Sequence, residues 1–521
     1  MATVSQLQTQ KQLFGHPIGL YILFFTEMWE RFSYYGMRAL LVLYMTTSTL
    51  GTDPRGIGLG WSEENALELY GWYTMLVYVL SIPGGMIADK LLGQKKSVLV
   101  GALILCAGHG VLAIEDLWAF YTGLGLVVLG VGMLKPNIST MVGGLYAPGD
   151  IRRDKGFSVF YIGINLGSLL ATLLVGFIVA EWGWHAGFAM AGVAMLLGLV
   201  VYLAGYKHLK YVGNLDKSDT EASDEVSYGR LYSDLFKSPK HLVITFVLVV
   251  VSIIGWFFLE WGYGLLFLFL TAIIALMMMI YKELNSQVYK DRFVVLLLSF
   301  IMVIIFWGAF EQAGGLMNLY TDSKTDRDLF GWTVPTMMFQ SLNAGFIIIF
   351  ATVVANIWAK RKLKGKEASS IFKMATGIII MGFGFLFMVF AAMQFEKSGS
   401  SSMIWLVLAY FFHTIGELCL SPVALSFITK LAPVKYASLM MGVYFAATGL
   451  GSKVAGIVGE SASDFGEYSV FLGILIFTIV IGLIFILLTK PLKRLTHGAE
   501  DNERKFQDVQ DNEPYELEEN I

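Results

Sequence analysis

The sequence predicts an all-α polytopic membrane protein, and two observations lead to that fold class. Of its 521 residues, 56% are hydrophobic and only 15% are charged, whereas soluble domains carry about 25% charged residues. The hydrophobic residues also gather in long runs of about 20, the length that an α-helix needs to cross a bilayer. The net charge of −3 offers no basic surface, so we expect a lipid bilayer and no nucleic acid as partner.

Fourteen of these runs qualify as membrane-spanning helices. An even number of spans places both chain termini on the same side of the membrane. The spans are expected at residues 17–48, 65–88, 96–114, 117–145, 156–180, 184–206, 241–259, 262–281, 293–320, 335–359, 370–392, 403–429, 436–459 and 468–489.

Positive charge decides which side holds the termini. The loops on the far side contain only four basic residues, Arg55, Lys324, Arg327 and Lys397, and most of the other lysines and arginines lie on the side of the termini. Lysine and arginine are enriched in cytoplasmic loops. We therefore expect a multi-pass protein with both termini in the cytoplasm.

The chain divides at one long polar segment. Residues 207–240 include the acidic stretch DKSDTEASDEVSYG, which has little to bury and separates six spans from eight. Transporters built as two six-helix halves around a midplane site show such a division, and the two spans left over look like an inserted hairpin. The expected units are a six-helix bundle at 1–206, a linker with the hairpin at 207–290, a second six-helix bundle at 291–490, and a disordered cytoplasmic tail at 491–521.

The first span carries three ionisable residues on one helical face. Glu27, Glu30 and Arg31 are spaced so that their side chains stack. Charged residues inside a membrane are costly, and they indicate function more often than structure. Two acids share one base here, so one carboxylate is in surplus. That surplus carboxylate is the natural proton carrier, because burial and a neighbouring cation act on its proton affinity in opposite directions.

Further charges lie in other spans. Arg38 follows Arg31 by two helical turns, and Lys135 immediately precedes Pro136 in GVGMLKPNIS, where proline tends to kink a helix. Glu311 and Glu417 supply acids in the second half. The GxGxxK pattern before Pro136 also resembles a phosphate-binding loop, but the strand that such a loop follows is missing.

Two other functional classes find little support. A membrane enzyme would need a nucleophile, base or metal set, and neither HExxH nor GxSxG occurs in the chain. The two cysteines, Cys106 and Cys419, both fall within apolar runs, so we expect no disulfide and no metal cluster. A channel would need rings of charge along a continuous pore. We therefore expect a carrier that is not an enzyme and has no cofactor.

Several motifs in order resemble one family. They are EMWERFSYYG (27–36), GGMIADKLLG (84–93), GVGMLKPN (130–137), FYIGINLGSL (160–169), FEQAG (310–314) and GELCLSPVALS (416–426). Together they resemble the proton-coupled oligopeptide transporter (POT/PTR) family of the major facilitator superfamily, in its bacterial type, over nearly the whole chain. Two departures, Tyr444 where members often have tryptophan and Ala424 where glycine is common, leave side-chain selectivity open.

The resemblance implies a role for each charged position. Glu27, Glu30 and Arg31 would form the proton-coupling ExxER motif. Lys135 with Glu417 would form an inner gate, and Arg38 with Glu311 an outer gate. The substrate site would be lined by Arg31, Tyr35, Arg38, Tyr78, Lys135, Asn165, Glu311, Asn343, Glu417 and Tyr444.

The function implied is import of di- and tripeptides together with protons, by alternating access, across the inner membrane of a bacterium and by a single chain. A peptide is a zwitterion, so its site needs a cationic and an anionic end, separated by roughly 3.5 Å per residue of extended chain. The alternative is a relative that carries another anionic substrate, such as nitrate or a drug-like carboxylate. Such a substrate would need the cations but not Glu417.

Overall fold

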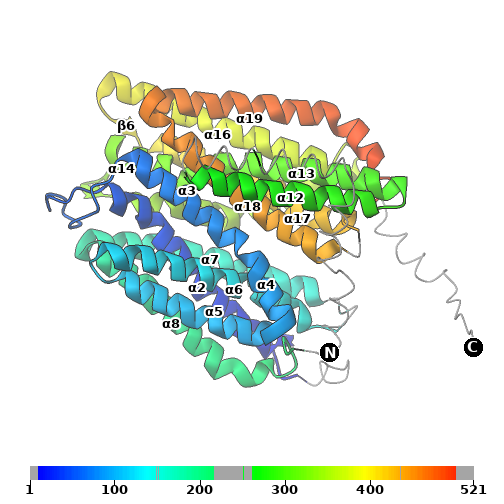
Figure 1. Cartoon of the computed structure of the whole chain (residues 1–521). Coiled ribbons are helices and arrows are strands. Elements are labelled where there is room, and N and C mark those ends of the chain that lie inside the picture. The colour runs from blue at the N-terminus through cyan, green and yellow to red at the C-terminus, as the bar shows by residue number, and fades with distance from the viewer. Residues whose placement is uncertain are drawn as a thin grey trace, which may run out of the picture.

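Figure 1 shows the computed structural model of the protein. The structure describes residues 10–147, 150, 152–215, 250, 261–433 and 436–499. The predicted span at 241–259, the acidic linker and the tail beyond residue 499 lie almost wholly outside the described residues. The other thirteen predicted spans all fall on helices.

The first half contains six of the predicted spans, and one of these is made of two helices. That span divides at Leu80, where α3 passes into α4 and then into a π-helical turn. Pro83, Gly84 and Gly85 follow this division and lie in α4. The elements are α2 (Ile18–Thr46), α3 (Glu63–Val79), α4 (Ser81–Ile87), the π turn η1 (Ala88–Leu92), α5 (Gln94–Leu112), α6 (Leu117–Gly144), α7 (Arg152–Trp182), α8 (Trp184–Gly205) and the 3-10 turn η2 (Tyr206–Leu209).

The second half follows the same plan after α12, a helix of the predicted hairpin. The elements are α12 (Trp261–Glu283), α13 (Gln287–Phe310), the 3-10 turn η3 (Glu311–Ala313), α14 (Leu316–Lys324), the 3-10 turn η4 (Thr336–Gln340), α15 (Ser341–Leu363), α16 (Ser370–Ser398), α17 (Ile404–Leu431), α18 (Ala437–Glu460) and α19 (Ala462–Leu495).

Three pairs of two-residue strands lie in the segments that connect the helices. The strand β1 (Gln12–Leu13) pairs with β2 (His16–Pro17) in an antiparallel hairpin before α2. The strand β3 (Thr325–Asp326) pairs in parallel with β6 (Ser401–Ser402). The strand β4 (Asp328–Leu329) pairs with β5 (Trp332–Thr333) in the loop after α14. These pairs hold loops in place and contribute no sheet to the core.

The predicted span at 293–320 falls on α13 and α14, and the helix is interrupted between them. The chain leaves α13 at Phe310, makes the 3-10 turn η3, and resumes as α14 only after Gly315, whose φ of −103° and ψ of −110° are not helical. Glycine adopts such angles without a steric cost because it has no Cβ. The break brings Glu311 to a helix end in the middle of the molecule.

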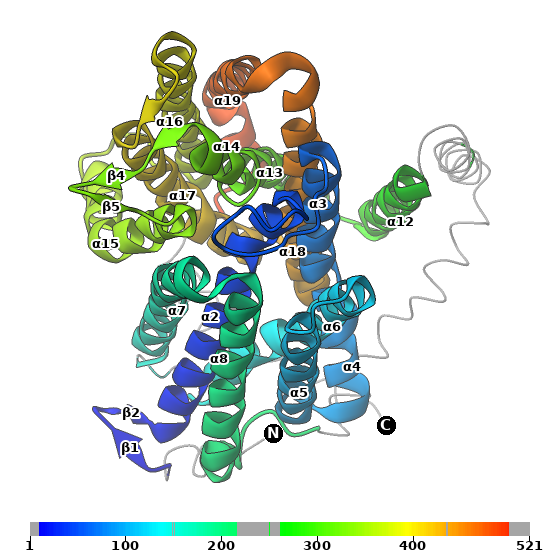
Figure 2. The ribbon, with the colours of Figure 1, turned by 90° about the vertical axis from the view of Figure 1, so that its left-hand side faces the viewer.

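The helices form two bundles that lie side by side, the first half below and the second above in Figure 1. Each bundle buries its own hydrophobic core. One core is built almost entirely from residues 20–212 and the other from residues 277–492. The two bundles also contact each other directly, most closely where α3 packs on α18 (Figure 2).

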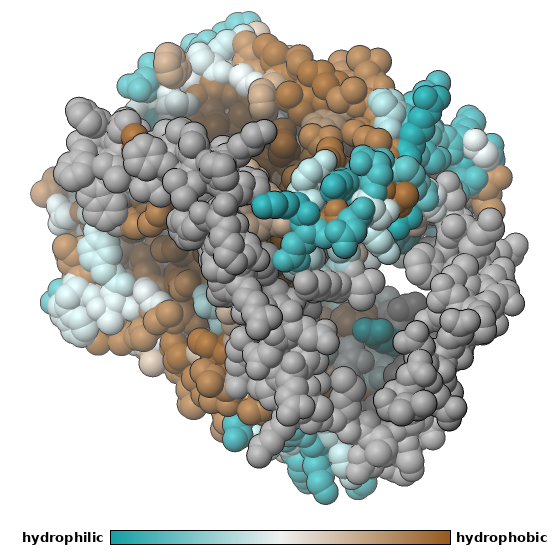
Figure 3. All heavy atoms as spheres, turned by 45° about the vertical axis from the view of Figure 1, so that its right-hand side comes forward, coloured by the Kyte–Doolittle hydropathy of each residue, from teal (hydrophilic) through white to brown (hydrophobic). Residues whose placement is uncertain are grey.

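The outer surface suits a membrane. Eleven helices in the described residues are long and apolar enough to cross one by length and composition. Many large hydrophobic side chains are exposed along these helices, and Figure 3 shows hydrophobic residues over much of the visible surface. A surface of this kind is stable when it faces lipid.

Candidate functional site

The three charges of α2 form one buried cluster. Arg31 Nε lies 2.8 Å from Glu27 Oε1 and 2.8 Å from Glu30 Oε2. All three side chains are buried, and only Glu27 Oε1 receives a hydrogen bond from the guanidinium among the described residues. One cation therefore serves two carboxylates, as the helical spacing predicts. Such an arrangement can hold or release one proton without breaking every ion pair.

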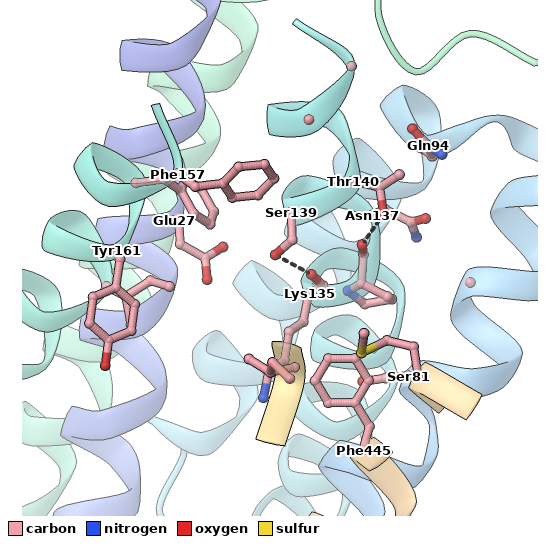
Figure 4. Close-up of a pocket in the computed structure, with 18 of the residues that line it drawn as sticks. Glu27, Ser81, Gln94, Lys135, Asn137, Ser139, Thr140, Phe157, Tyr161 and Phe445 are labelled. Carbon is pink, nitrogen blue, oxygen red and sulfur yellow. Dashed lines mark hydrogen bonds between the residues drawn. The ribbon is translucent and has the colours of Figure 1, made fainter. Parts of the chain in front are cut away.

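A large cavity opens beside this cluster. It has a volume of about 2600 Å³ and runs from the charged residues of α2 to the loops around Gly93 and Tyr211. Figure 4 shows Glu27, Lys135 and Tyr161 entering the space from three different helices. Of the predicted site residues, those that line the cavity are Glu27, Arg31, Tyr35, Tyr78, Lys135, Asn165, Glu417 and Tyr444.

Lys135 is placed by an irregular part of α6. Pro136 has no N–H to donate to the carbonyl of Gly132, and the backbone of Gly132 lies against Gly84 of α4, where a Cβ would come within 2.0 Å of that carbonyl oxygen. Asn137 Nδ2 donates to Met133 O at 2.7 Å. The ammonium of Lys135 lies 3.7 Å from the centroid of the Tyr78 ring, a cation–π contact.

Glu417 provides the opposite charge on the second half. Its Oε2 accepts a hydrogen bond of 2.8 Å from Asn343 Nδ2, and Asn343 also donates to Thr414. Asn343 thus reaches the cavity through Glu417 and does not itself line it. Lys135 and Glu417 each have other partners in this structure and are not paired with each other. The cavity is open at this end, so the predicted inner pair is not engaged in this state.

The opposite end of the cavity is closed by a charged contact between the bundles. Arg38 Nη2 lies 2.7 Å from Glu311 Oε2, and both side chains are buried. Tyr70 of α3 joins the pair: its hydroxyl accepts from Arg38 Nε at 2.8 Å and donates to Glu311 Oε2 at 3.1 Å. A Cβ at Gly314 would lie 2.1 Å from that hydroxyl and 2.9 Å from Arg38 Nε. Gly314 therefore leaves the space that this contact occupies.

A second charged network lies in the loops beyond this contact. Arg55 pairs with Asp53 at 2.7 Å in its own loop and with Asp322 at 2.9 Å in α14 of the other bundle. Thr336 Oγ1 donates to Asp322, and Arg327 lies 3.4 Å from it. The hydrogen bonds from Arg55 hold the pKa of Asp53 below its usual value. This network also joins the two bundles at the closed end.

The helices α3 and α18 complete the closure by close backbone packing. A Cβ at Gly71 would lie 3.1 Å from the Cα of Gly456, and one at Gly456 would lie 2.9 Å from Leu67 O. Backbones approach this closely in membrane helices where glycines face each other. Lys453 of α18 is buried nearby, with its Nζ 3.7 Å from Glu460 Oε1.

Several of these partners were missed by reasoning from sequence. Tyr70 carried no signal of its own. Gly314 belongs to the FEQAG motif, but the sequence did not indicate the contact that it makes with Tyr70. The Asp53–Arg55–Asp322 network joins loops that are far apart in the chain. A signal was present in FYIGINLGSL: a Cβ at Gly167 would lie 2.2 Å from Met28 O, and Gly163 faces Phe24. Part of that motif therefore packs α7 on α2.

The family was tested by comparison with known proteins. Residues 95–469 match the model of the POT family. The chain belongs to the POT family. The resemblance read from the motifs is therefore confirmed, and the POT family members compared below are transporters.

Two relatives of this POT chain match along almost its whole length. An uncharacterized transporter of Bacillus subtilis, YclF, is 37% identical over 94% of this chain and 97% of its own. A di-/tripeptide transporter of Lactococcus lactis is 33% identical over 94% of this chain and 98% of its own. The similarity thus includes both bundles.

A solved POT structure confirms the fold. The crystal structure of a peptide transporter POT in complex with sulfate has a TM-score of 0.81 and 35% identity, and the match covers 95% of this chain and 99% of that one. The predicted major facilitator fold is therefore the fold of this protein.

Proposed function

We propose that this POT protein is a proton-coupled symporter that imports di- and tripeptides by alternating access. The observation that carries the proposal is that one cavity holds both Arg31 and Lys135 of the first bundle and Glu417 of the second. The two ends of a zwitterionic peptide need these opposite charges. The relative from Lactococcus lactis, which is named a di-/tripeptide transporter, supports this substrate class.

Alternating access is supported by the asymmetry of the two ends. Arg38, Glu311 and the Arg55 network close one end by contacts between the bundles, while the other end is open beside Lys135 and Glu417. By the distribution of basic residues, the open end faces the cytoplasm. We infer that the structure is an inward-facing state of a bacterial inner-membrane transporter, and that Lys135 and Glu417 meet when the inner end closes.

Proton coupling is supported by the cluster on α2. Three of the four carboxylate oxygens of Glu27 and Glu30 are buried and accept no hydrogen bond from the described residues. The cluster holds two carboxylates against one guanidinium, so it can take up one proton and still keep an ion pair to Arg31. We infer that protonation of one carboxylate changes how the Arg31 guanidinium is divided between Glu27 and Glu30. Because Arg31 also lines the cavity, this change can affect the bound substrate. The mechanism needs one chain and no cofactor.

The test is uptake in proteoliposomes made with the full chain. A labelled dipeptide should accumulate when the outside is acidic, and a proton ionophore should abolish the accumulation. An excess of unlabelled dipeptide should compete, whereas nitrate or a carboxylate drug without an amino group should compete poorly. If nitrate or the carboxylate drug competes and the dipeptide does not, the chain carries another anionic substrate.

A further inference from the structure

A second cavity lies on the lipid side of the second bundle. It has a volume of about 780 Å³ and is formed between α12, α13 and α18. Twelve of its fifteen lining residues are aliphatic or phenylalanine, and the remaining three are Tyr281, Lys282 and Lys290. In Figure 2, α12 stands beside the two bundles, on the side of α3 and α18. We call this cavity the α12 groove.

The polar residues of the α12 groove are all at one end. Lys282 lies at the last turn of α12 and Lys290 in the first turn of α13, on either side of the short turn that joins these helices. Lys290 Nζ lies 5.7 Å from the centroid of the Tyr281 ring. Both helices therefore bring a cation to the same mouth of the groove. This is the end that the basic residues assign to the cytoplasm.

The acids next to these lysines have other partners. Glu283 accepts a hydrogen bond from the hydroxyl of Tyr436. Asp291 lies 2.7 Å from His497 Nε2 and accepts from Gln287 at 2.6 Å. No ion pair to a carboxylate is found for Lys282 or Lys290 among the described residues, and Lys282 is exposed. Two positive charges are thus left at the mouth of an apolar groove.

The length of the groove matches one leaflet of a membrane. Along α12 the lining runs from Lys282 back to Leu270, a rise of twelve residue steps or roughly 18 Å of helix. The hydrocarbon of one leaflet is about 15 Å deep. An acyl chain that entered the groove would place its phosphate beside the two lysines. A soluble anion would fit the lysines but would leave the apolar length empty.

We propose that the α12 groove is a binding site for an anionic phospholipid of the cytoplasmic leaflet, with the acyl chain between α12, α13 and α18 and the headgroup phosphate at Lys282 and Lys290. The wall includes Val443, which is adjacent in α18 to Tyr444 of the central cavity. The bound lipid therefore contacts a helix that also lines the transport pathway.

The experiment measures lipid retention by native mass spectrometry of the purified full chain. Titrations use phosphatidylglycerol, phosphatidylcholine with the same acyl chains, and glycerol phosphate as the free headgroup. Each lysine near an anionic lipid contributes about fivefold in affinity. We therefore expect the double variant Lys282→Gln/Lys290→Gln to bind phosphatidylglycerol about 25-fold more weakly and phosphatidylcholine unchanged, while glycerol phosphate alone is not retained.

Two matched controls make the result specific. Lys362→Gln/Lys364→Gln removes two exposed lysines at the end of α15 and should leave binding unchanged. Ile274→Trp partly fills the groove and should weaken both lipids, whereas Ile349→Trp, exposed on α15, should not. Equal retention of the two lipids by the wild type, equal loss in both lysine pairs, or retention of glycerol phosphate alone would overturn the proposal. Failure of the wild type to bind either lipid would also overturn the proposal, and would favour a segment of this chain as the occupant of the groove.

Discussion

Arg38 of α2 and Glu311 of the second bundle lie 2.7 Å apart in a buried ion pair that Tyr70 of α3 completes with two hydrogen bonds. Three elements thus meet at one point between the bundles. Breaking a buried ion pair by removing one partner costs several kcal/mol. We therefore expect this contact to favour the state in which the outer end is closed and the inner end is open.

The first prediction concerns Gly314. In Gly314→Ala the new Cβ would overlap the Tyr70 hydroxyl, which lies 2.1 Å from its position. The contact should loosen and the population should shift toward the outward-open state. Spin labels at Thr52 and Ser400, in a chain without its two cysteines, should report longer distances at the outer end. Gly473→Ala, where a Cβ meets nothing within 4 Å, is the matched control, and an equal shift in both variants would contradict the account.

The second prediction concerns the outer loop and pH. The pKa of Asp53 is lowered, chiefly by hydrogen bonds from Arg55. A carboxyl group with a lowered pKa stabilises the folded contact above its ordinary pKa of about 3.9, and this stabilisation is lost as the pH falls through the lowered value. Asp53 therefore stays charged between pH 5 and 8.

Asp53→Asn should thus leave the shape of the uptake profile between pH 5 and 8 unchanged, even if it lowers the rate. Asp464→Asn, an exposed acid at the same end, serves as the control for loss of one charge. A profile that flattens in Asp53→Asn alone would show that this loop takes part in proton coupling.

The third prediction concerns the inner pair. We expect Lys135 and Glu417 to be buried together once the inner end closes. Neutralising either one would leave an unpaired buried charge and cost about 3 to 5 kcal/mol in that state. Lys135→Gln and Glu417→Gln should each express poorly, and the double variant should express better. The measurement is the yield of monodisperse protein. Equal yields from all three would mean that no populated state buries the pair.

The fourth prediction concerns the amino end of the substrate. If Glu417 binds the peptide ammonium, a dipeptide with an acetylated amino end loses a charge-assisted contact of about 1.5 to 3 kcal/mol. It should then compete for uptake roughly ten- to a hundredfold more weakly. In Glu417→Gln the gap between the free and capped peptides should narrow. If the free and the acetylated dipeptide compete equally well in the wild type, the result would favour a carrier of another anionic substrate.

The sequence predicted the spans well because a helix in a membrane depends mainly on local composition. Length and hydropathy are sufficient for α16 or α19. The charged triad of α2 was also predictable, because residues spaced i, i+3 and i+4 lie on one face of any α-helix. Contacts between segments that are distant in the chain could not be predicted. Arg55 and Asp322 are 267 residues apart, and no periodicity relates them.

The break at Glu311 shows a second limit. The sequence FEQAGG placed helix-breaking residues there, but whether a helix bends or stops depends on what its ends contact. Gln312 Nε2 donates to Ala455 O of α18 at 2.9 Å, and Tyr70 fills the space at Gly314. Packing against α18 of its own bundle and against Tyr70 of the first bundle therefore selects the broken form.

Proton coupling at the α2 cluster is the central claim, and Glu30→Gln tests it most directly. The amide keeps the shape of Glu30 and cannot exchange a proton. In proteoliposomes, accumulation of labelled dipeptide under an inward proton gradient should be abolished, while exchange of labelled for unlabelled dipeptide without a gradient should remain measurable. Gradient-driven accumulation that persists in this variant, or equal loss of accumulation and exchange, would contradict the account.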